Sequence, residues 1–185
     1  MSIREITLGA DHGQIGSGGS GAHWVTAADA TRWVAKATFF GGQQHKYLYL
    51  NEALTSLIAQ RLGVGVPEPA ALRLTAAQAE QFRQGLSDVE RLVFASARIE
   101  PSEALSPEAA RSADKLEVAG IIVFDTLIWN TDEKPEHVPA QPQDDGTWRL
   151  WPVDRGHALA VADSLQSLQP ADAAYQPMQL LHDCL

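Results

Sequence analysis

A run of glycines near the start of the chain is the first feature with chemical potential. The run fits the pattern G-x-G-x-x-G and consists of Gly16, Ser17, Gly18, Gly19, Ser20 and Gly21. Glycine lets a backbone approach phosphate oxygens closely and point its N–H groups at them. Dinucleotide-binding folds place a helix directly after such a loop, whereas kinases place a strand there. A flexible surface loop would have the same composition.

The residues after the glycines favour the kinase arrangement. His23–Thr26 and Thr31–Phe39 are predicted strands, joined by a short turn that contains Asp29. Lys36 lies in the second strand, where its ammonium group could reach the phosphates of a nucleotide. Such a lysine needs a carboxylate to hold it, and Glu52 lies beside the apolar stripe of the next predicted helix. A solvated Lys36 at a strand edge and a solvated Glu52 on a helix surface are the alternative interpretation.

Two aspartates in the second half of the chain follow elements that would hold them rigidly. Asp132 comes directly after the apolar segment Leu116–Trp129 and could orient a hydroxyl group or accept its proton. Asp154 leaves the predicted strand Trp148–Val153, and its carboxylate could bind Mg²⁺. Both positions are also typical of turn aspartates.

Hydrophobic periodicity predicts the elements that position these residues. In the first half it predicts three further strands, over Ile3–Leu8, Ala70–Leu74 and Glu90–Ala97. It also predicts two helices, one over Tyr47–Leu62 that ends at Gly63 and one over Thr75–Gly85. In the second half, Ser106–Lys115 is a predicted helix with Ser106 as N-cap. Leu116–Trp129 is apolar nearly all round, which predicts a helix buried on most faces.

The order of these elements predicts an α+β fold. Residues 131–147 are predicted to be a loop, and the tail from Ala160 is predicted to be helical in pieces. We therefore expect one domain over residues 1–185, with a strand-rich lobe over 1–97, a helical lobe over 98–185 and a cleft between them.

The composition narrows the class of protein. The formal charge of −9 and scattered basic residues argue against a general nucleic-acid-binding protein. No apolar run is long enough for a membrane span, residues 1–9 do not fit a signal peptide, and Cys184 is the one cysteine. We therefore expect a cytoplasmic protein.

Two segments of the second half resemble the catalytic loop and the metal-binding segment of HipA-like bacterial kinases. They are residues 124–132 (FDTLIWNTD) and residues 150–159 (LWPVDRGHAL). The glycine loop, residues 34–36 (VAK), the Asn51-Glu52 pair and residues 62–67 (LGVGVP) resemble the N-terminal lobe of that family. The resemblance covers most of residues 16–159 and implies a protein-kinase-like fold with two lobes.

The resemblance also implies cofactors and roles. ATP and Mg²⁺ or Mn²⁺ would be the cofactors. The glycine loop and Lys36 would hold the phosphates, Glu52 would orient Lys36, and Ala97 would add a nucleotide contact. Asp132 would be the catalytic aspartate and Asp154 would bind metal. The partner would be a protein substrate with a serine or threonine hydroxyl group, and the oligomeric state stays open.

One position departs from the family pattern. His137 stands where the family has an asparagine that binds the second metal ion, and Glu133 replaces an arginine. A histidine suits transition metals better than Mg²⁺, and Asn130 or Glu136 are alternative ligands. An active kinase and a pseudokinase that only binds nucleotide are both compatible with this change, and nucleotidyl transfer or a small-molecule substrate are further alternatives. Asp125, on the buried helix, is expected to bond to backbone near the catalytic loop, and His157 to pack or cap after Asp154.

Overall fold

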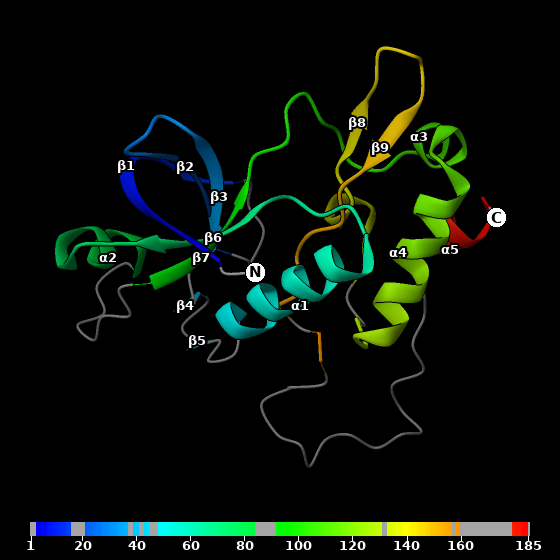
Figure 1. The fold of residues 1–185 in the computed structure, drawn as a ribbon. Helices are drawn as coiled ribbons and strands as arrows, with labels where there is room; N and C mark the ends of the chain where they lie inside the picture. The colour runs from blue at the N-terminus through cyan, green and yellow to red at the C-terminus, as the bar shows by residue number, and fades with distance from the viewer. Residues whose placement is uncertain are drawn as a thin grey trace. The chain divides into compact units, whose positions relative to one another are not determined.

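The computed structural model describes residues 3–15, 21–36, 39–40, 43–44, 48–83, 92–130, 133–156, 158–159 and 179–184. Helices and strands both occur, so the α+β class is confirmed (Figure 1). The chain divides into two compact units, Met1–Ala53 with Glu68–Arg98, and Leu54–Pro67 with Ile99–Leu185.

Five strands of the first unit form a closed barrel in the order β1-β2-β3-β7-β6 (Figure 1). Their bounds are Arg4–Gln14 for β1, Ala22–Ala27 for β2, Arg32–Lys36 for β3, Pro69–Arg73 for β6 and Leu92–Ala97 for β7. Neighbouring strands are antiparallel except β1 and β6, which run parallel and close the barrel. Because side chains alternate between the faces of a strand, every second residue points into the barrel. The core they form includes Ile6, Val25, Ala27, Trp33, Ala35, Ala70, Leu72, Val93 and Ala95.

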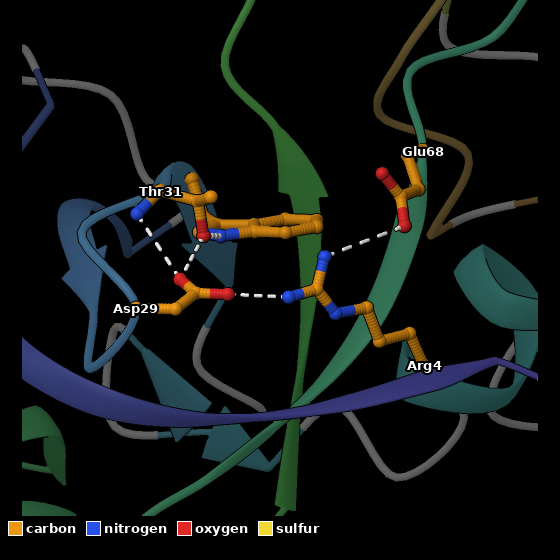
Figure 2. A network of polar contacts seen from close by, with 5 residues as sticks. Arg4, Asp29, Thr31 and Glu68 are labelled. Atoms are coloured by element: carbon orange, nitrogen blue, oxygen red, sulfur yellow. Dashed lines mark hydrogen bonds and ion pairs between the residues drawn. The ribbon is translucent and has the colours of Figure 1, made fainter.

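A polar network ties the start of β1 to the turn between β2 and β3 (Figure 2). Arg4 pairs with Asp29, lies 4.0 Å from the carboxylate of Glu68, and sits over the ring of Trp33 at 5.9 Å. Asp29 accepts hydrogen bonds from the backbone and side chain of Thr31, whose hydroxyl accepts one from Trp33 Nε1 at 2.7 Å. Arg4 and Asp29 are close to half exposed, so water screens their attraction and the pair contributes little to stability.

The element that follows the glycine loop is a strand and not a helix, since β2 begins at Ala22. The dinucleotide-binding alternative is therefore wrong. The strand β3 ends at Lys36, earlier than predicted, and Phe39 belongs to the short strand β4 (Phe39–Phe40), which pairs with β5 (Gln43–Gln44).

Helix α1 (Leu48–Leu62) confirms the helix predicted over residues 47–62, and α2 (Ala76–Arg83) confirms the helix predicted after Thr75. Gly63 ends α1 with φ +76°, a left-handed conformation that glycine adopts without steric cost. The division between the two units falls within α1, after Ala53.

Besides the part of α1 from Leu54 onward, the described residues of the second unit contain the helices α3 (Pro107–Ser112), α4 (Lys115–Leu127) and α5 (Gln179–His182). They also contain the 3₁₀ turn η1 (Pro135–His137) and a hairpin of β8 (Ala140–Pro142) and β9 (Trp148–Leu150). Ser106 caps α3 by accepting a hydrogen bond from Ala109 N, as predicted. The predicted loop 131–147 instead contains β8, which pairs with β9.

Helix α4 corrects one prediction. Val118, Ile121 and Phe124 are buried, but Leu116 is 83% exposed and Val123 is 67% exposed. The helix is therefore buried along one face and not on most faces. Within the described ranges, every helix is too short or too polar to cross a bilayer.

Candidate active site

Lys36 and Glu52 form a buried ion pair in the first unit. Lys36 Nζ lies 2.5 Å from Glu52 Oε1, and the two residues are 6% and 3% exposed. Alternation along β3 places Lys36 on the opposite face of the sheet from the core residue Ala35. Charges buried to this degree are tolerated only when they are paired, because each loses its hydration. The solvated alternative for both residues is therefore wrong.

The end of the glycine loop lies beside this pair. Gly21 has φ +55°, in the left-handed region that glycine adopts readily. Ile15 N donates to Ala22 O at 2.7 Å, which joins the two ends of the loop. Ala22 is directly opposite Lys36 in the ladder, at a Cα separation of about 4.5–5.5 Å. The other residues of the loop lie outside the described residues, and their roles stay predictions. They are Gly16, Ser17, Gly18, Gly19 and Ser20.

Ala97 does not join Lys36 on one face of the sheet. It pairs with Trp33 across the β3–β7 ladder, whereas Lys36 pairs with Phe94. The offset of three residues puts the side chains of Ala97 and Lys36 on opposite faces. Ala97 packs against the barrel core and its N–H donates to Glu68 O, so its side chain and its N–H group are both engaged within the first unit.

The hairpin of the second unit brings His137 and Asp154 together. Trp151 N donates to Pro139 O at 2.8 Å and Val153 N donates to His137 O at 2.7 Å, which continues the β8–β9 pairing beyond the strands. His137 Nε2 consequently lies 3.5 Å from Asp154 Oδ2. Asp154 has φ +60°, a conformation that is uncommon outside glycine and is found at functional sites.

The pair fits a divalent metal ion as two of its ligands. Metal–ligand distances of about 2.0–2.2 Å allow atoms 3.5 Å apart to share one ion. An imidazole with a carboxylate favours Mn²⁺ over Mg²⁺. Among the described residues, no three His, Cys, Asp or Glu side chains gather as a metal site. Asp132 lies outside the described residues, and its role stays a prediction.

A buried polar cluster is formed by residues that are close in sequence to Asp132 and Asp154. Asp125 Oδ1 accepts from Arg155 Nε at 3.2 Å and from Asn130 Nδ2 at 3.4 Å. Asn130 Nδ2 also donates to Glu133 Oε2 at 2.7 Å. Asp125, Asn130 and Arg155 are each at most 2% exposed. The expectation that Asp125 bonds to backbone is wrong, because its carboxylate accepts from these two side chains.

Sequence reasoning missed this cluster as a unit. From the sequence, Asn130 was predicted only as an alternative metal ligand, and Glu133 was noted only because it replaces an arginine of the family. No role was predicted for Arg155. A polar residue amid the apolar run of α4 was the one signal for it, since a carboxylate there requires a buried donor.

The cluster raises the pKa of Glu133 to about 9 from 4.5. Burial is the largest cause, and the negative charge of Asp125 and a hydrogen bond with it act in the same direction, while Arg155 opposes them. Glu133 is therefore protonated near neutral pH.

Replacing Glu133 with glutamine is expected to flatten the dependence of stability on pH. The folded protein holds a proton that the unfolded chain releases, so wild-type stability falls as pH rises from about 4.5 toward about 9. The slope from one proton is about 1.4 kcal/mol per pH unit. Glutamine keeps a neutral side chain without this titration, so E133Q should be more stable than wild type at pH 8. Urea unfolding at pH 5, 6.5 and 8 measures the effect, with the exposed Glu136→Gln as control. Parallel curves for wild type and E133Q would contradict it.

Comparison with solved structures defines the class of fold. Fifteen chains of solved structures match this one. Among them is the crystal structure of a Helicobacter pylori proinflammatory kinase, CtkA, at a TM-score of 0.52 and 13% sequence identity. The match covers 85% of this chain and 60% of the CtkA chain, so this chain spans about 60% of that protein's length. The likeness shows a kinase-type fold.

Sequence comparison then defines the family. Residues 12–140 match the family model of HipA-like kinases, which is well over half of the 185 residues, and the chain belongs to that family. The resemblance seen in the sequence is confirmed. No curated protein sequence matches the chain.

Proposed function

We propose that this protein transfers the γ-phosphoryl group of ATP to serine or threonine hydroxyl groups of a protein substrate. The buried Lys36–Glu52 pair is the observation that carries the proposal. A buried ion pair is not required for stability, since apolar residues in its place would leave the protein about as stable, so the pair indicates a functional role. Fixing a positive charge for nucleotide phosphates is such a role, and the end of the glycine loop lies beside it.

The proposed roles follow from chemistry at each residue. Lys36 and the backbone N–H groups of the loop bind phosphate oxygens. Asp154 and His137 hold Mn²⁺ or Mg²⁺, which neutralises phosphate charge when bound. Asp132 orients the substrate hydroxyl and takes its proton as the oxygen bonds to the γ-phosphorus. The bond from that phosphorus to the β-phosphate oxygen breaks, and ADP leaves.

Nucleotide-dependent stabilisation tests the binding part of the proposal. ATP with Mn²⁺ or Mg²⁺ should raise the unfolding temperature of wild type. At a ligand concentration one hundred times the Kd, the added free energy of unfolding is about 2.7 kcal/mol. Asp154→Ala should lose the metal-dependent part of the shift, whereas the exposed Asp144→Asn should keep it. A wild-type protein that no nucleotide stabilises, with either metal, would refute the proposal.

A nucleotide-binding pseudokinase is the second candidate, and His137 supports it. The family's asparagine is replaced by a residue that faces Asp154 at 3.5 Å, so the metal site differs from that of the family. ATP labelled at the γ- or the α-phosphate separates the candidates. Label passing from the γ-position to protein supports the kinase, label from the α-position indicates nucleotidyl transfer, and binding without transfer favours the pseudokinase.

A further inference from the structure

The backbone around Asp154 is anchored on both sides. On one side, Val153 N donates to His137 O at 2.7 Å. On the other side, Arg155 is 2% exposed and its side chain makes two buried hydrogen bonds. Asp154 lies between these anchors with φ +60°. A residue stays in this conformation only when its surroundings determine it.

Arg155 makes contacts in three directions. Its Nε donates to Asp125 Oδ1 at 3.2 Å, its Nη1 donates to Pro152 O at 3.0 Å, and its guanidinium carbon lies 4.9 Å from the ring centroid of Phe124. The bond to Pro152 O closes a turn of the chain around Asp154. The bond to Asp125 fastens that turn to helix α4.

We propose that Asp125 and Arg155 are a positioning pair, which holds Asp154 in the left-handed conformation that directs its carboxylate toward His137. The importance of this position for metal binding rests on the proposed function. The pair acts through Asp154 and touches neither nucleotide nor metal. Lysine could supply the same charge, but it lacks the two separate donors that reach Asp125 and Pro152 O together.

The test needs a variant that folds without the pair. Removing Arg155 alone would leave the carboxylate of Asp125 buried and uncompensated, which destabilises a protein strongly. The double variant Asp125→Leu/Arg155→Met removes both charges and keeps similar volume. Arg155→Lys is the conservative variant, and Arg149→Met is the matched control, because Arg149 is an exposed arginine of the same unit that stacks on Trp151.

Two measurements follow the position of Asp154. The first is hydrogen exchange of the Val153 amide in protein without nucleotide or metal. The second is the Kd for Mn²⁺, measured by electron paramagnetic resonance in the presence of ATP. In the double variant we expect exchange at Val153 to be at least tenfold faster and the Kd to rise at least tenfold, with the cooperative unfolding transition retained. Arg155→Lys should be intermediate, and Arg149→Met should match wild type.

The outcomes separate this inference from the proposed function. Unchanged exchange at Val153 in the double variant would overturn the positioning role. Faster exchange with an unchanged Kd for Mn²⁺ would overturn its link to metal binding. A wild-type protein that binds no Mn²⁺ would refute the proposed metal site, while the exchange at Val153 would still decide whether the pair positions Asp154.

Discussion

Replacing Lys36 with methionine is expected to lower phosphoryl transfer by about 10²–10³-fold, because it removes a fixed positive charge from the phosphates. The same change leaves Glu52 buried at 3% exposure without its partner 2.5 Å away. Breaking a buried pair in this way costs about 3–5 kcal/mol of stability. Transfer of label from γ-labelled ATP measures the first effect, and urea unfolding measures the second.

A double variant separates the two effects of Lys36. Lys36→Met with Glu52→Leu removes both charges of the pair, so its stability should return close to that of wild type. Its transfer rate should stay as low as that of the single variant. Recovery of transfer along with stability would show that the lysine serves the fold alone.

Replacing Asp132 with asparagine is expected to lower transfer by about 10²–10⁴-fold, because asparagine cannot accept the proton of the substrate hydroxyl. The two side chains have the same shape, and the proposed role of Asp132 is to act on the substrate hydroxyl and not on the nucleotide. Stabilisation by ATP and metal should therefore be unaffected. Initial rates with γ-labelled ATP and the shift of unfolding temperature with ATP measure the two expectations.

The exposed residue Asp144, between β8 and β9, provides the control for Asp132, since Asp144→Asn makes the same substitution at a surface position. That variant should transfer phosphate at the wild-type rate. Equal losses in the two variants would point to a general effect of negative charge, and full activity in Asp132→Asn would remove the assignment.

The sequence predicted the elements whose signals are local. Apolar residues at helical spacing predicted α1, and Gly63 marked its end because a left-handed residue is needed there. Alternating residues predicted the strands that carry Trp33 and Val93 into one core. Closure of the barrel was not predicted, because it depends on pairing between β1 and β6, and no local pattern specifies which distant strand becomes a neighbour.

The same distinction applies to the candidate site. Lys36 and Glu52 were predicted to meet because such a lysine needs a carboxylate partner and Glu52 lies on the next predicted helix, and the structure brings them together. Asp125 and Arg155 are 30 residues apart, and their contact depends on how α4 packs against the chain after β9. The carboxylate of Asp125 within the apolar run of α4 indicated that a buried hydrogen-bond donor was needed, but not which residue supplies it.

The parallel pairing of β1 with β6 also sets an order of events during synthesis. Arg4 is paired with Ala70, so 66 residues (70 minus 4) must be added before the first strand meets its partner. At ribosomal rates of about 5–20 residues per second, that interval lasts about 3–13 s. For that time Ile6, which is 5% exposed in the finished barrel, has no neighbour on the β6 side. During synthesis, the edge of β1 that pairs with β6 therefore stays open until β6 has been made.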